Sequence, residues 1–198
     1  MSVVVAQLTK VKVVIEGIAP GVMFQGKGVM EADANGKKPK KRSQEEEARL
    51  RAHWMGRGKN KQLCIPWVMF QKSFCQAANA FDWVMPDGKK QKVKLGYIIG
   101  STLTCEVDFI SLGTDQFETW VEWVRIPPKT GAMVQIGRPL IRKWKVEMIL
   151  VIDDEMWNVA ILEEIIAHAG KVVGIGAQRP GLKGPYGKFV VLSFEVME

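Results

Sequence analysis

Two stretches, Lys143 to Ile152 (KWKVEMILVI) and Lys188 to Val196 (KFVVLSFEV), frame the part of the chain that decides its fold. Both are rich in β-branched and aromatic residues and have the length of buried strands. Between them, mostly apolar residues recur at spacings of three and four, which predicts a helix through Met156, Val159, Leu162, Glu163, Ile166 and Ala169. Gly170 is its expected C-terminal cap. Residues 174–187 hold five glycines and two prolines, so they form an irregular loop.

The preceding residues predict further strands and one long helix. Lys10 to Glu16 has a strand pattern, and the glycines after it indicate a loop or twisted hairpin over residues 18–30. Ile65-Pro66 is expected to open a helix, with Pro66 at its first position. Its predicted buried face comprises Trp67, Phe70, Phe74, Ala77, Ala78 and Phe81. Residues 95–112 and 117–126 have β patterns that could pair as a hairpin across a turn at 113–115.

This order of elements predicts an α+β domain spanning residues 1–198. Its core would be β-α-β-β-α-β, the ferredoxin-like (RRM-type) plan with two helices on one face of an antiparallel sheet. Residues 31–63 would be a basic, flexible insertion after the first strand, and residues 113–137 a hairpin and loop extension. The exposed sheet face of this plan often binds nucleic acid.

Positive charge is concentrated in the insertion. Residues 36–61 contain ten basic and three acidic residues, a net +7 that equals the net charge of the whole chain. Within this segment, Ser43 and Glu46 have capping-box spacing, which predicts a short helix from Ser43 to His53. The flanks, residues 36–42 and 56–62, have the composition of mobile chain. Such an arm on a neutral body is typical of polyanion binding, although a solvated loop is the alternative.

Composition indicates what class of protein this is and in which compartment it is expected. Hydrophobic residues make up 47% of the chain, enough for a folded core. The cysteines, Cys64, Cys75 and Cys105, show no metal-ligand or disulfide spacing, which favours reduced thiols in a cytoplasmic protein without a metal or other cofactor. No signal-peptide pattern and no apolar run of membrane-spanning length is present in the sequence.

The glycine-rich ending resembles a known family. Gly174-Ile175-Gly176 and Gly184-Pro185-Tyr186-Gly187-Lys188-Phe189, before the last strand of a ferredoxin-like core, are similar to the glycine-rich loop of the RAMP superfamily. The basic insertion and the Cys64-Ile65-Pro66 entry to the first helix resemble the backbone subunits of CRISPR effector complexes. RAMP-like single-strand-binding proteins of bacteriophages are similar as well. The resemblance implies a bacterial, archaeal or phage-encoded protein that assembles head-to-tail along RNA or single-stranded DNA.

Three groups of residues are candidate contacts to a nucleic-acid strand. The arm offers cations for phosphates and an indole for base stacking: Lys40, Lys41, Arg42, Arg49, Arg51, Trp54, Arg57, Lys59 and Lys61. Arg138, Arg142 and Lys143 could line the same strand-binding groove as the arm. Alternatively, they could be charges that keep a strand edge from aggregating with other chains. Arg179, Lys183 and Lys188 accompany the glycine-rich loop, where glycines either let backbone N–H groups approach phosphate or simply allow tight turns.

Two further functions remain open. A RAMP-type endoribonuclease would need an acid or base, for which His53 and, by position after the first strand, Asp33 are the candidates. A protein-interaction module would use the arm on an acidic partner, and Trp120 and Trp123 are candidate subunit contacts or caps on the core. The favoured function is non-enzymatic binding of a single strand.

Overall fold

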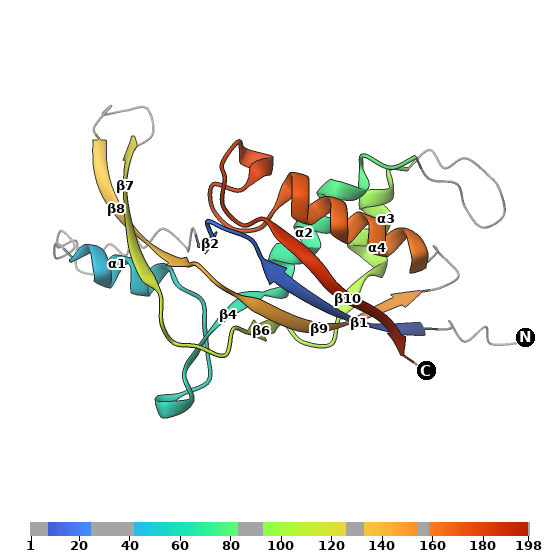
Figure 1. The fold of residues 1–198 in the computed structure, drawn as a ribbon, viewed down its shortest axis with the longest axis horizontal. Coiled ribbons are helices and arrows are strands. Elements are labelled where there is room, and N and C mark those ends of the chain that lie inside the picture. The colour runs from blue at the N-terminus through green and yellow to red at the C-terminus, as the bar shows by residue number, and fades with distance from the viewer. Residues whose placement is uncertain (1–7, 25–41, 83–92, 126–132, 154–158, 198) are drawn as a thin grey trace, which may run out of the picture.

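The computed structural model describes residues 8–24, 42–82, 93–125, 133–153 and 159–197. Within these ranges, helices and antiparallel strands form an α+β protein (Figure 1). None of the described helices is long and apolar enough to cross a membrane.

A four-stranded antiparallel sheet lies at the centre. Its order is β10 (Phe189–Met197), β1 (Leu8–Gly17), β9 (Lys145–Asp153) and β5 (Thr104–Cys105). The three long strands confirm the predictions for residues 10–16, 143–152 and 188–196, with ends shifted by one or two residues. Burial alternates along β1 and β9, so each strand has one face in the core and one face outside.

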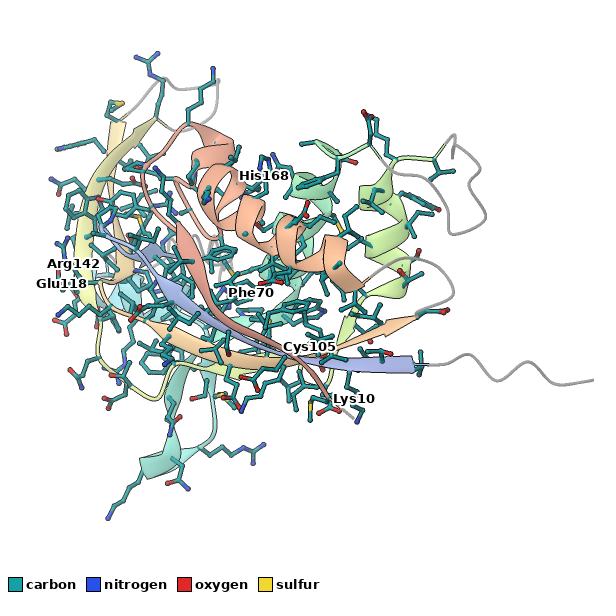
Figure 2. The ribbon with its side chains drawn as sticks, turned by 45° about the vertical axis from the view of Figure 1, so that its right-hand side comes forward. Lys10, Phe70, Cys105, Glu118, Arg142 and His168 are labelled. Carbon is teal, nitrogen blue, oxygen red and sulfur yellow. The ribbon has the colours of Figure 1, made fainter. Side chains whose placement is uncertain are left out.

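Helices cover one face of this sheet (Figure 1): α2 (Trp67–Ala78), α3 (Leu95–Thr102), α4 (Val159–His168) and the π-helical turn η2 (Ala169–Val173). Phe70 lies between the helical layer and the sheet and packs on Trp144 and Phe189 (Figure 2). The predicted buried face of α2 is confirmed from Trp67 to Ala78, while Phe81 lies beyond the helix and is half-buried.

Both predicted helix boundaries next to Pro66 and Gly170 are wrong. Pro66 ends strand β4 (Gln62–Pro66) and is the N-cap of α2, because the residues before it pair with another strand. The last helix continues past Gly170 and ends at Gly174, where φ is 67°. Gly170 serves instead in close packing, since a Cβ there would overlap the backbone oxygen of Phe189. The predicted first turn of this helix, at Met156, lies outside the described residues.

The β pattern predicted over residues 95–112 is wrong in its first half and holds only for two short strands in its second half. Its first half is helix α3, whose residues Leu95 and Ile99 are buried against α2. Gly96 allows this contact, because a Cβ at that position would overlap the backbone oxygen of Cys75. The rest contains the short strands β5 and β6 (Phe109–Ser111). Tertiary packing therefore overrides the β propensity of Tyr97, Ile98 and Ile99.

Strand β7 (Glu118–Arg125) pairs with β8 (Met133–Ile141) instead of with the residues before it. The other edge of β8 pairs with β2 (Val22–Met23). This hairpin stands at one end of the molecule beside α1 (Gln44–Arg51) (Figure 1). Strand β4 pairs with β6 on one side and with β3 (Trp54–Met55) on the other, which connects the basic arm to the core.

Candidate nucleic-acid interface

The described part of the basic arm, residues 42–61, begins with a helix whose N-terminal half is capped and held against the hairpin. The capping box is confirmed: the Ser43 hydroxyl accepts from the Glu46 N–H at 3.1 Å, and the Glu46 carboxylate accepts from the Ser43 N–H at 2.9 Å. Glu47 accepts a hydrogen bond from the Gly137 N–H at 3.1 Å, which occupies a donor on β8. A Cβ at Gly137 would overlap the Gln44 backbone, so α1 lies directly on β8. The arm is therefore docked on the hairpin.

Trp54 is the centre of the described arm. The guanidinium carbon of Arg49 lies 5.5 Å from the centre of its ring, and the Lys61 ammonium nitrogen lies at 4.5 Å. The indole N–H donates to the Arg49 carbonyl at 3.0 Å, and the ring meets Phe117 edge-on at 6.2 Å. At these distances both cations make cation–π interactions with the ring, which hold two positive charges at an aromatic surface.

Beyond Trp54 the chain forms a projecting hairpin (Figure 1). The flank over residues 56–62, predicted to be mobile, contains the 3-10 helix η1 (Gly58–Asn60) between β3 and β4. Arg57, Lys59 and Lys61 are exposed there and have no ion-pair partner among the described residues. Their charges are therefore available to an external anion.

The remaining candidate residues of the arm are less accessible or lie outside the described residues. Arg42 and Arg51 are half-buried. Burial lowers the pKa of Arg51 from its ordinary value, Glu47 opposes this effect, and the charge of Arg138 adds to it. Lys40, Lys41 and Asp33 lie outside the described residues.

Arg138 does not lie on the surface. It is 8% exposed, and its Nε forms an ion pair with Glu122 of the facing strand. Glu122 also accepts from the side-chain amide of Gln178 in the glycine-rich loop. Arg138 thus helps to join the hairpin to that loop, and the interface proposed below leaves it out.

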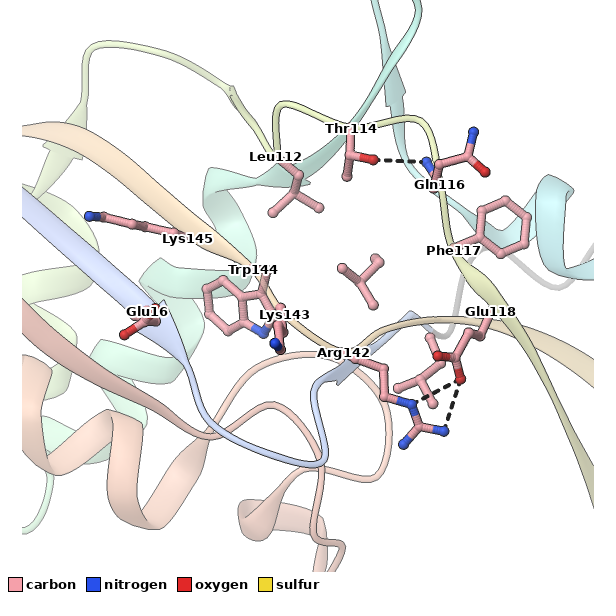
Figure 3. A pocket seen from close by; sticks show the side chains of 12 residues that line it. Glu16, Leu112, Thr114, Gln116, Phe117, Glu118, Arg142, Lys143, Trp144 and Lys145 are labelled. Atoms are coloured by element: carbon pink, nitrogen blue, oxygen red, sulfur yellow. Dashed lines mark hydrogen bonds and ion pairs between the residues drawn. The ribbon is translucent and has the colours of Figure 1, made fainter.

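Arg142 and Lys143 are exposed, as predicted for contacts to a strand, but Arg142 already has a partner. Its Nε and Nη2 both donate to one carboxylate oxygen of Glu118, each at 2.9 Å. Arg142 and Glu118 lie side by side at the left edge of the molecule in Figure 2. Both flank a groove of about 570 Å³ that Lys143 and Lys145 also line (Figure 3).

Close packing of the backbone explains why the loop before β10 is rich in glycine. Its N–H groups donate inward: Ala177 to the Met23 carbonyl at 2.7 Å and Gly187 to the Gly21 carbonyl at 2.7 Å. Side chains of the loop, of β8 and of β2 form a small core of Met23, Leu140, Ala177 and Tyr186. Of the three candidate cations here, Lys183 is exposed, whereas Arg179 and Lys188 are half-buried. The geometry favours tight turns over a phosphate cradle.

The open face of the central sheet is not a stacking platform. Lys10 pairs with Glu106 at 2.6 Å and Lys12 with Glu147 at 3.1 Å, so these two lysines of the open face already have acidic partners. The aromatic residues of β10, Phe189 and Phe194, lie on the helix side with Gly17 and Val13 of β1. RRM domains stack bases on aromatics of the open face. In the described part of this sheet, that feature of the predicted RRM-type plan is missing.

The two hairpin tryptophans have different surroundings. Trp120 packs on Tyr186 with ring centres 6.1 Å apart, as expected of a cap on a core. Trp123 is 61% exposed. A subunit contact at this position stays a prediction.

His53 and the cysteines are placed for packing. His53 is half-buried and meets Phe24 edge-on at 5.2 Å. The three cysteines are free, and burial raises the pKa of the Cys64 thiol to about 11. Within the described ranges, no group of three or more His, Cys, Asp or Glu side chains is placed to hold a metal ion.

Burial makes His53 a source of acid sensitivity. Burial lowers its pKa below the ordinary value, so on acidification the unfolded chain takes up a proton that the folded chain resists. The free energy of unfolding should therefore fall between about pH 7 and about pH 5. Urea denaturation should show a smaller fall for His53→Gln. Equal falls for the two proteins would mean that folding does not shift this pKa.

The sequence contains no signal that would identify three of the groove residues, Phe117, Glu118 and Lys145, as part of a binding site. They belong to segments that alternate as strands do, and the alternation does not reveal which segments meet. Only the pairing of β7 with β8 brings Glu118 to Arg142.

No protein family model matches the chain, and no curated protein matches it. Among solved structures, the chain is similar to one chain in the cryo-electron microscopy structure of Type III-B Cmr-beta bound to cognate target RNA. The TM-score is 0.52 at 11% sequence identity, and the match covers 97% of this chain and 61% of that chain. At this identity the similarity shows a shared fold.

Proposed function

We propose that this protein binds single-stranded RNA through the described part of its basic arm. The observation that carries the proposal is the cluster around Trp54, where Arg49 and Lys61 lie over the ring and Arg57 and Lys59 extend the positive charge along the hairpin. Cations beside an aromatic surface are the elements with which proteins hold a phosphate backbone and stack its bases.

A ferredoxin-like core, the plan of the RAMP superfamily, is part of the proposal, and the strand order is the observation that supports that core. In a β-α-β-β-α-β chain, each helix crossover leaves room for one strand between the strands that it joins. Two interleaved crossovers then give the order fourth, first, third, second, with all neighbours antiparallel. The order β10, β1, β9, β5, with α2 and α3 before β5 and α4 before β10, has this form.

The structural neighbour favours RNA over DNA as the ligand, because the Cmr-beta complex is bound to cognate target RNA. Head-to-tail assembly along the strand is part of the proposal, since one small module makes few contacts and cooperative binding compensates for that. The ribonuclease alternative has no comparable support, because His53 packs against Phe24.

The test is the binding of fluorescein-labelled single-stranded RNA, single-stranded DNA and duplex RNA over a salt series, with heparin as competitor. We expect single-stranded RNA to bind tightest, with the four exposed arm cations contributing about 3 to the log–log salt slope by neutralising four phosphates. A preference for single-stranded DNA would change the ligand but keep the site. Binding of heparin alone would favour an acidic protein partner.

A further inference from the structure

A groove lies where the start of β9 meets the segment that leads into β7. Figure 3 shows its two walls, one carrying Leu112 and Phe117, the other Arg142 to Lys145. Its volume of about 570 Å³ is within the range of sites that hold small organic ligands.

The groove is continuous with the arm. Phe117 lines it and also contacts Trp54, with ring centres 6.2 Å apart. The same wall is bonded to β4, because the Leu63 N–H donates to the Thr114 carbonyl at 2.7 Å and the Leu112 N–H donates to the Leu63 carbonyl at 2.9 Å. A strand lying on Trp54 therefore meets this groove next, on a wall held in place by backbone hydrogen bonds.

The charges of the groove suit a phosphate. Lys143 and Lys145 are exposed and have no ion-pair partner within the described ranges. Two carboxylates, Glu16 and Glu118, also line it, and Glu118 holds Arg142. The Arg142 and Glu118 side chains are 50% and 57% exposed, and ion pairs this exposed are weak. A phosphate can therefore take the guanidinium from the carboxylate at little cost.

We propose that this groove is a nucleotide subsite for the strand that the arm binds, an inference that rests on the proposed function. The base of one nucleotide lies against Leu112 and Phe117, and its phosphate lies on Lys143 and Lys145. Glu118 restrains Arg142 in the free protein and releases it to the phosphate. Glu118 is thus a built-in competitor of the ligand.

The test compares variants by fluorescence anisotropy with a uridine RNA of about 12 nucleotides, a length within the usual site size of single-strand binders. Replacing Lys143 and Lys145 together by alanine should lower the salt slope by about 0.7, the contribution of the one phosphate that they hold. Glu118→Gln should raise the affinity about twofold to fivefold, a gain that misfolding cannot produce. In an Arg142→Ala background the same change should give a much smaller gain.

The outcomes separate the two proposals. A wild-type protein that binds no single strand at low salt would overturn the proposed function and this subsite with it. Wild-type binding with an unchanged slope in the double lysine variant would overturn the subsite alone. A full gain from Glu118→Gln in the absence of Arg142 would overturn the exchange of partners. The double variant Lys72→Ala, Lys171→Ala is the matched control, since it removes two exposed lysines from the helical layer and should leave the slope unchanged.

Discussion

Replacing Arg57, Lys59 and Lys61 together by alanine is expected to weaken the binding of single-stranded RNA by about 100-fold near 0.1 M salt. The three side chains are exposed and have no ion-pair partner within the described ranges, so removing them breaks no ion pair in that part of the chain. Each phosphate contact on a single strand contributes roughly 0.7 to the salt slope, so three contacts account for about 2.1. Anisotropy titrations over a salt series would measure both quantities, and the loss should shrink as salt rises.

The control removes the same charge elsewhere. Lys72, Lys94 and Lys171 are exposed on the helical layer, and changing all three to alanine should alter the affinity much less than the arm variant does. Equal losses in the two triple variants would mean that net charge, and not the arm, governs binding.

Gly187→Ala is expected to lower the free energy of unfolding by about 3 kcal/mol or more. Gly187 has φ of 74°, and an added Cβ would overlap the backbone oxygen of Ile175. Because this atom belongs to the backbone and not to a flexible side chain, it cannot move aside easily. The same turn also places the Gly187 N–H to donate to the Gly21 carbonyl. Urea denaturation of wild type and variant would measure the loss.

Gly113→Ala is the control that measures the conformational cost alone, so the difference between the two variants gives the cost of the overlap at Gly187. Gly113 has a similar φ of 67°, but nothing lies within 4 Å of the position of its Cβ. It should therefore lose only the conformational cost of a left-handed residue, about 1 to 2 kcal/mol. Equal losses at the two positions would mean that the overlap at Gly187 relaxes freely, and the glycine-rich loop would then be open to a ligand-binding explanation.

The sequence was sufficient for the elements whose pattern is local. The strands at residues 10–16 and 143–152 alternate, the strand at residues 188–196 is rich in β-branched and aromatic residues, and the Ser43–Glu46 capping box depends on only four residues. Helix α3 could not be predicted, because Tyr97, Ile98 and Ile99 favour strands and only contact with α2 selects the helix.

The candidate site was predictable as a charged segment and not as a surface. Localised positive charge identified the arm, and the tip of its hairpin is exposed as that prediction requires. Burial of Arg138 and restraint of Arg142 depend on Glu122 and Glu118 of the facing strand. These pairings follow from the register of β7 with β8. The sequence does not specify that register, because residues 117–126 could pair with the residues before them or with those after them.

Photo-crosslinking of single-stranded RNA carrying 4-thiouridine, followed by mass spectrometry of the linked peptides, tests most directly whether the arm holds the strand. Crosslinks should fall on Trp54, on the hairpin from Arg57 to Lys61, and on Phe117 where the groove begins. Crosslinks confined to the open sheet face around Lys10 and Lys12, or to the helical layer, would contradict the proposed interface.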